Sequence, residues 1–218
     1  MDDLLDDFLK PLAEENKEKC IEWVRQKLDS GEMDILTLYT EILMPAQNQL
    51  VCWQDETLCI WKEHVRTSII RTIIEFCYPY VVKERDAKFG GANGRKVLIG
   101  CPSEEYHEIG ARMVADYFTL LGFDVVFVGA NTPQKEILDA IKHVKPEYIG
   151  ISVTNFYNLV AANRLGEELA RIRKDNELDF KIIVGGNAFR SNPEAKEEIG
   201  ADALIQTFQE LKRFVEGS

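Results

Sequence analysis

The stretch KVLIGCPSEEYHEIG, Lys96 to Gly110, joins a short apolar run to a polar loop and the start of a second apolar segment. The apolar run predicts a buried strand, and the residues after it predict a helix from Tyr106 to Leu121. His107 lies at this predicted strand-to-helix junction. Ligands of parallel sheets bind beyond the carboxyl ends of the strands, so this junction is the first candidate for a functional site.

The residues after this loop alternate between short apolar runs and amphipathic segments. The expected strands are Val97–Cys101, Asp124–Val128, Tyr148–Ser152, Lys181–Val184 and Ala203–Ile205, and the expected helices are Tyr106–Leu121, Gln134–His143, Tyr157–Lys174, Pro193–Glu198 and Phe208–Val215. Strands rich in Val and Ile that alternate with helices are typical of a parallel sheet covered on both faces. We therefore expect a doubly wound α/β domain with a five-stranded parallel sheet over residues 96–218.

The residues before residue 86 show helical periodicity instead. Helices are expected over Asp3–Leu28 with a kink or break at Pro11, over Asp34–Leu43, over Pro45–Trp53, and from Thr57 to a bend or end at Pro79. Four helices joined by short turns predict a four-helix bundle over residues 1–86. The glycine-rich run DAKFGGANGR, Asp86–Arg95, lacks periodicity, so residues 87–95 are expected to link the bundle to the α/β domain.

The composition disfavours several classes of protein. Hydrophobic residues make up 45% and charged residues 29% of the chain, as in an ordinary globular protein. No apolar run approaches the roughly 20 residues of a membrane helix, and the acidic start MDDLLDD does not resemble a signal peptide, so a cytoplasmic protein is expected. The formal net charge of -11 argues against direct contact with nucleic acid, because phosphate binding needs clustered Lys and Arg.

The cysteines are odd in number, form no CxxC pair and lie in apolar settings. They are Cys20, Cys52, Cys59, Cys77 and Cys101. This pattern predicts reduced thiols in the protein core, and it disfavours both a disulfide framework and a zinc site.

Three features lie at the carboxyl ends of expected strands. Glu105-x-His107-x-x-Gly110 follows the first strand, Ser152-Val153-Thr154 closes the third, and Gly185-Gly186 closes the fourth. A carboxylate two positions before an imidazole can accept its second ring N–H and orient it as a metal ligand, and Gly110 leaves room for a bulky group. Singly, the hydroxyls are more often strand-end caps and the glycines a turn. Their joint placement favours a slot for a long, flat ligand.

This set of motifs resembles that of the cobalamin-binding domain family, which has [D/E]xHxxG, S-x-[L/T] and GG on a flavodoxin-like (Rossmann-like) sheet. The resemblance covers Lys96 to the C-terminus and includes IGARMVADYFTLLGFDVVFVG, TPQKEI and IGADAL. It implies cobalamin as the cofactor, in its adenosyl or methyl form, with His107 as the lower axial ligand of cobalt and Glu105 as its orienting partner. The residues implied to line the site of the displaced nucleotide tail are Ser152, Thr154, Gly185 and Gly186.

The expected bundle carries a second pattern, WQDETLCIWKEH, in which Trp53 is followed after nine residues by Glu63 and His64. The pattern resembles the Wx9EH motif of the CarH-type light-sensing cobalamin regulators, and it implies that the bundle covers the upper face of the cofactor. By this resemblance Trp53 packs against the alkyl group on cobalt, while Glu63 and His64 bind its polar part. The structural alternative makes Trp53 and Trp61 core residues of the bundle and His64 a partner of Glu63.

This sequence differs from those regulators in two features. A DNA-binding winged helix precedes their bundle, whereas this sequence starts at the bundle, in agreement with its acidity. Sensors that form a second histidine bond to cobalt use the residue directly after the tryptophan. That residue is Gln54 here, so the same second bond is not predicted.

The resulting hypothesis is a two-domain cobalamin protein without enzymatic activity of its own. It would be a stand-alone photoreceptor or regulatory module in signal transduction, read by a protein partner or by its own oligomer. The alternative is a corrinoid protein that carries a methyl group between methyltransferases, and a third possibility is a module that has lost the cofactor. A phosphoacceptor site is disfavoured, because it needs aspartates at the positions where this sequence has Cys101 and Ser152. A flavin site is disfavoured because the carboxylates of PSEEYHE would repel the flavin phosphate.

Overall fold

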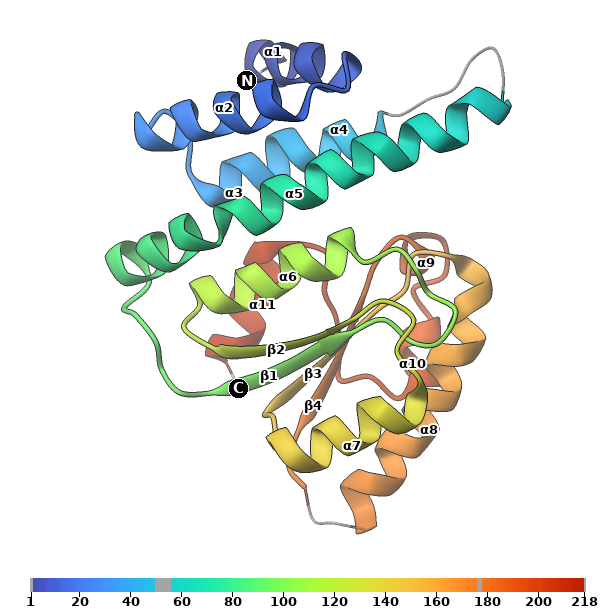
Figure 1. The fold of residues 1–218 in the computed structure, drawn as a ribbon. Helices are drawn as coiled ribbons and strands as arrows, with labels where there is room; N and C mark the ends of the chain where they lie inside the picture. The colour runs from blue at the N-terminus through green and yellow to red at the C-terminus, as the bar shows by residue number, and fades with distance from the viewer. Residues whose placement is uncertain (1, 50–55, 176–177, 218) are drawn as a thin grey trace. The chain divides into compact units, whose positions relative to one another are not determined.

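The computed structural model describes residues 2–49, 56–175 and 178–217. The chain forms two compact units, Met1–Glu84 and Arg85–Ser218. The first unit is helical, and the second is a sheet covered by helices (Figure 1). Within the described part of the chain, none of the helices combines the length and apolar character needed to cross a membrane.

The described residues of the first unit form four helical segments. These are α1 (Asp2–Ala13), α2 (Lys17–Asp29), the continuous run of α3 (Ile35–Thr37), η1 (Leu38–Leu43) and α4 (Met44–Asn48), and the first part of α5 (Glu56–Lys88). Their apolar side chains meet in a shared core that includes Phe8, Leu12, Val24, Leu38, Tyr39, Ile42, Ile70 and Ile73. The predicted helical region before the sheet is therefore present, and burial of these faces stabilises it.

The helix boundaries differ from prediction near each proline. Pro11 lies inside α1, and the break comes after Ala13, so the first expected helix is two helices. The second and third expected helices are one continuous run. Pro45 cannot donate the N–H that an unbroken α-helix needs, and the turns before it widen into the π-helix η1, which accommodates the missing bond. Pro79 lies inside α5, which continues to Lys88 instead of ending there.

The sheet formed by the described residues of the second unit has five strands in the order β2-β1-β3-β4-β5 (Figure 1). The strands are β1 (Lys96–Gly100), β2 (Asp124–Gly129), β3 (Tyr148–Ser152), β4 (Lys181–Gly185) and β5 (Ala203–Leu204), and all neighbours pair in parallel. This is the predicted flavodoxin-like order, and it confirms the fold class. The winding reverses between β1 and β3, where ligands of such sheets bind.

Helices cover both faces of the sheet. They are α6 (Ile109–Leu120), α7 (Gln134–Val144), α8 (Leu159–Asp175), α9 (Ala188–Ser191), α10 (Ala195–Ile199) and α11 (Phe208–Glu216), with the short helix η2 (Phe156–Asn158) before α8. Figure 1 shows α6 and α11 on one face and α7 and α8 on the other. The core under α7 and α8 joins apolar residues of these helices to strand residues such as Leu98, Ile149 and Ile182.

The second unit also differs from prediction at the start of α6, at the end of α5 and in one additional short helix. α6 begins at Ile109 instead of Tyr106, because the His107 N–H donates to the Glu105 side chain and holds this segment as a loop. The short helix α9 was not predicted. α5 extends to Lys88, into the expected linker, because Ala87 and Lys88 favour helix and the first glycine comes only at residue 90.

The described cysteines are buried and free, as predicted, at Cys20, Cys77 and Cys101. Burial raises the pKa of the Cys20 thiol to about 11 and that of Cys101 to about 12, with a smaller contribution from nearby carboxylates. Both thiols are therefore protonated and unreactive at neutral pH. Cys52 and the side chain of Cys59 lie outside the described residues.

The contact between α8 and α10 allows a test of the packing. A side chain at the buried Gly166 of α8 would place its Cβ 2.2 Å from the carbonyl oxygen of Ile199. Gly166→Ala should therefore lower the free energy of unfolding by about 1 to 3 kcal/mol, although alanine is the better helix former. Urea denaturation measures the change, and the exposed neighbour Glu167→Ala serves as control, with an expected change within about 0.5 kcal/mol. An unchanged or higher stability of Gly166→Ala would contradict the packing of α8 on α10.

Candidate functional site

The loop between β1 and α6, residues 101–108, is held in one conformation by the loop after β2. The N–H of Glu104 donates to Oδ1 of Asn131 at 2.8 Å, and the N–H of Asn131 donates to the carbonyl oxygen of Glu105 at 2.7 Å. Glu104 and Asn131 both have positive φ, 70° and 48°, a backbone conformation with a conformational cost for residues other than glycine. These mutual hydrogen bonds compensate for that cost and place Glu105 beneath His107.

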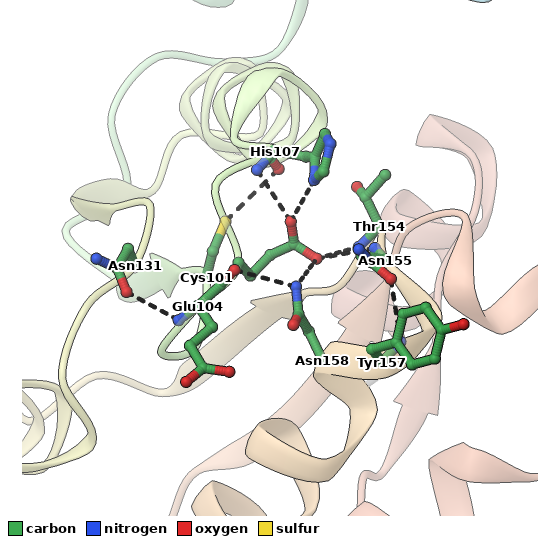
Figure 2. A network of polar contacts seen from close by, with 9 residues as sticks. Cys101, Glu104, His107, Asn131, Thr154, Asn155, Tyr157 and Asn158 are labelled. Atoms are coloured by element: carbon green, nitrogen blue, oxygen red, sulfur yellow. Dashed lines mark hydrogen bonds and ion pairs between the residues drawn. The ribbon is translucent and has the colours of Figure 1, made fainter.

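Glu105 is fully buried, and both oxygens of its carboxylate accept hydrogen bonds. Figure 2 labels the residues that donate them, His107, Thr154, Asn155 and Asn158. Oε1 accepts from the His107 N–H at 2.9 Å and lies 2.6 Å from Nδ1 of the same residue. Oε2 accepts from the N–H groups of Thr154 and Asn155, both at 2.9 Å, and from Nδ2 of Asn158 at 3.1 Å. Burial alone would raise the pKa of Glu105, but the hydrogen bonds from Asn155, His107 and Asn158 outweigh it and lower the pKa. Glu105 is therefore a buried anion at neutral pH.

The His107 ring is oriented by this buried carboxylate, yet its side chain is 58% exposed. A carboxylate at Nδ1 favours the tautomer with its proton on that nitrogen, which leaves Nε2 unprotonated. No residue in the described part of the chain hydrogen-bonds to Nε2. An imidazole held at one nitrogen and open at the other is prepared to coordinate a metal ion.

The end of β3 contributes main-chain groups to this network, where the sequence suggested hydroxyls. Thr154 donates its backbone N–H to Glu105, and Ser152 pairs with Gly185 across the sheet. Asn155 and Asn158, which the sequence analysis missed, supply two further donors. The sequence did contain a turn signal here, since Asn155 caps η2 by accepting the Tyr157 N–H at 3.1 Å. Only the folded sheet brings that turn to Glu105.

The glycine pair after β4 has a reason within the protein for lacking side chains. A Cβ at Gly185 would lie 2.6 Å from the carbonyl oxygen of Ile205, and one at Gly186 would lie 2.3 Å from that of Val153. Gly186 also has a φ of +108°. These glycines let the ends of β3, β4 and β5 approach closely. Their predicted role beside a nucleotide tail stays a prediction.

Gly110 differs from this pair. It lies in the first turn of α6 and is exposed, and a Cβ there would meet no atom within 4 Å. The described protein therefore supplies no steric reason for a glycine at this position. Gly110 follows His107 by three residues, and its expected role of leaving room for a bulky group stays a prediction.

Exposed apolar side chains gather near the same loop. Among the described residues of the second unit, the exposed large hydrophobic residues are Tyr106, Phe156, Tyr157 and Val160. Tyr106 precedes His107, and the other three lie in η2 and at the start of α8, the segment that binds Glu105 through Asn158. Exposed aromatic groups concentrated in one place are typical of a surface that binds an apolar ligand or partner.

The residues of the second motif lie in the first unit. Trp53 and Gln54 fall outside the described residues. Glu63 is partly exposed and His64 exposed, both in α5. Trp61 is 46% exposed, so the expectation that Trp61 is a core residue is wrong, whereas the same expectation for Trp53 falls outside the described residues. The upper-face roles expected for Trp53, Glu63 and His64 stay predictions.

A flavodoxin-like sheet with a carboxylate-held, exposed imidazole at its switch point is the arrangement of a protein that binds a ligand or cofactor beyond the carboxyl ends of its strands. The model of the B12 binding domain family matches residues 95–211, more than half of the 218 residues. The chain belongs to this family, and its cofactor is cobalamin.

Known proteins similar to the chain include transcriptional repressors and corrinoid proteins. The HTH-type transcriptional repressor CarA of Myxococcus xanthus is 25% identical over 183 residues, which cover 82% of this chain and 57% of CarA. A corrinoid protein of Desulfitobacterium hafniense is 20% identical over 202 residues, which cover 92% of this chain and 91% of that protein. The structure of the monomethylamine corrinoid protein of Methanosarcina barkeri has a TM-score of 0.76 at 17% identity, covering 98% and 97% of the two chains. The chain thus spans little more than half of CarA but nearly all of the two corrinoid proteins.

The buried carboxylate gives a prediction for the cofactor-free protein. Glu105→Gln replaces an acceptor of several N–H groups by an amide, so it should lower the free energy of unfolding by about 2 to 3 kcal/mol at neutral pH. Because folding lowers the pKa of Glu105, its contribution is complete above the unfolded value and declines as the pH falls through the folded value. The difference from wild type should therefore be constant above about pH 5 and shrink below it. Urea denaturation across this range measures it, and a pH-independent difference would contradict the assignment.

Proposed function

We propose that this chain holds cobalamin with Nε2 of His107 as the lower ligand of cobalt, and that it serves as a light-sensing or regulatory module with an alkylcobalamin. The observation that carries the proposal is the His107 ring, fixed at Nδ1 by a buried anion and exposed to solvent. When bound, cobalamin supplies the cobalt ion and an alkyl–cobalt bond that light can break. Imidazole nitrogen is a suitable ligand for such an ion.

The described residues fit this cofactor in three respects. Glu105 keeps the proton on Nδ1 and increases the basicity of Nε2, as carboxylate partners do for metal-bound histidines. Gly110 leaves space beside the ring. The exposed side chains of Tyr106, Phe156 and Tyr157 offer apolar surface for the rim of a large macrocycle. We further propose that the end of β3 and the Gly185-Gly186 turn flank the nucleotide tail.

The sensor role is supported by the sequence of the first unit. Trp53, Glu63 and His64 have the spacing of the light-sensing regulators, and the similarity to CarA extends over 82% of the chain. In this role Trp53 would exclude water from the alkyl group, and loss of that group would change the packing of the first unit. A protein partner or a second copy of the chain would bind differently to the two states of the first unit.

The alternative is a corrinoid protein that carries methyl groups between methyltransferases. The specific support for it is length, because the similarity to the Desulfitobacterium hafniense corrinoid protein spans 91% of that protein. In this role His107 would leave and rejoin cobalt during the cycle. The same Glu105 contacts would hold the ring in place for its return.

The ligand role is tested by His107→Ala. Loss of the only proposed protein ligand should weaken cobalamin binding by more than about 100-fold, beyond the range typical for residues that only orient a ligand. Absorption of the reconstituted, desalted protein measures bound cofactor. His143→Ala in α7 is the matched control and should bind like wild type. Equal binding by His107→Ala would contradict the proposed ligand.

Illumination separates the two roles. Protein reconstituted with adenosylcobalamin should change its absorption spectrum and its gel-filtration volume together after green light, because loss of the alkyl group repacks the first unit. Parallel samples with a reductant, a methyl donor and a methyltransferase test the carrier role. A light-dependent shift without methyl transfer supports the sensor, whereas methyl transfer with an unchanged elution volume supports the carrier.

A further inference from the structure

We infer that the glycine-rich segment after α5 is a strap held on the second unit, and that a single helical turn connects the two units. The strap is residues 89–95, between the end of α5 and β1. Glycine-rich segments usually behave as flexible linkers. Here contacts at three places along the segment, at Phe89, Asn93 and Arg95, attach it to helices and strands of the second unit.

Asn93 holds the middle of the strap on the turn between α6 and β2. Its N–H donates to the carbonyl oxygen of Gly122 at 2.8 Å, and its Nδ2 donates to that of Leu121 at 3.0 Å. Its Oδ1 accepts the N–H of Arg95 at 2.9 Å. One asparagine thus makes two hydrogen bonds to another segment and one within the strap, which restricts the backbone around it.

The turn opposite Asn93 leaves room for the strap because it contains a glycine. Gly122 has a φ of +90°, and a Cβ there would lie 2.5 Å from the carbonyl oxygen of Gly91 and 3.0 Å from Nδ2 of Asn93. A side chain at position 122 would therefore strain the turn and displace the strap. The two segments are distant in sequence, so the fold brings them together.

The two ends of the strap are held by an aromatic ring and a guanidinium group. The Phe89 ring packs edge-on against Phe208 of α11, with the ring centroids 5.9 Å apart. Arg95 donates from Nε to Glu147 at 2.9 Å and from Nη2 to the hydroxyl of Tyr148, also at 2.9 Å. Both ends of the strap are therefore attached to the second unit.

Shortly before the strap, α5 is held within the first unit. The Glu84 carboxylate accepts the N–H of Ile35 at 3.0 Å, and the Tyr80 hydroxyl donates to Asp29 at 2.8 Å. Between Glu84 and the strap lies one turn of α5, residues 85–88. A helical turn is stiffer than a glycine-rich chain, because main-chain hydrogen bonds hold its residues. This connection therefore transmits a bend or rotation that a loose linker would absorb.

The consequence of this connection for signalling rests on the proposed function. In that function, loss of the alkyl group changes the packing of the first unit. The change would pass along α5 to the end that the strap holds on the second unit. The strap would therefore be needed for a response that involves both units, whereas binding of cobalamin would not depend on it.

Amide hydrogen exchange of the cofactor-free protein, followed by NMR, tests the strap. The N–H groups of Asn93 and Arg95 should exchange at least about 100-fold more slowly than in an unstructured chain, because both are hydrogen-bonded. Asn93→Ala should speed exchange at Arg95 by about tenfold. Asn93→Asp keeps the acceptor for the Arg95 N–H, so it should retain part of the protection.

Asn163→Ala is the matched control, because Asn163 of α8 also donates from Nδ2, to Glu198 at 3.2 Å. It should leave exchange in the strap unchanged. Wild-type protein needs no variant for the main result. Strap amides in wild type that exchange as fast as in an unstructured chain would overturn the inference.

Exchange in protein loaded with adenosylcobalamin, before and after green light, tests the connection. Strap amides should keep their dark exchange rates while amides of the first unit change. Strap amides that exchange faster after illumination would identify the strap as the part that moves, which would overturn the inference and leave the sensor role intact. A protein without any response to light would contradict the sensor role, and the strap would still be decided by exchange in the cofactor-free protein.

Discussion

The buried carboxylate of Glu105 is the constraint on which the rest of the site depends. An anion without solvent contact is costly unless hydrogen bonds replace the lost water, and here both oxygens are satisfied by N–H donors. The donors come from the loop after β1 and from the turn after β3. Both the loop after β1 and the turn after β3 therefore have to be in place for the carboxylate to remain charged. The charged carboxylate in turn keeps the His107 ring in one orientation.

The strand order explains why these two segments can meet. β1 lies between β2 and β3, so the loop after β1 has a neighbouring strand end on each side. Asn131 after β2 fixes the main chain of the loop, while residues 154–158 after β3 bind the Glu105 side chain. Close packing at the glycines after β4 extends the same edge of the sheet. The parallel sheet thus acts as a rigid support that holds the His107 ring in one orientation.

The surface around this ring differs from the rest of the described second unit. Its exposed aromatic residues belong to the two segments that Glu105 joins, and Gly110 next to them is open to solvent. Apolar surface that the protein core does not use is typical of a surface that contacts a ligand or partner. In the proposed function the imidazole would supply one bond to the metal, and this contact area would supply part of the affinity.

The sequence alone determined the fold class, because the alternation of Val- and Ile-rich runs with amphipathic helices allows few arrangements. Local spacing also paired Glu105 with His107, since a two-residue separation on one loop already brings their side chains within reach. The partners of the second carboxylate oxygen were decided only by tertiary structure. Asn158 is 53 residues from Glu105, and its local pattern predicts only a turn. The sequence of the glycine pair was likewise compatible with either a turn or a ligand slot. Only the folded sheet shows that the backbones of neighbouring strands approach closely at these glycines.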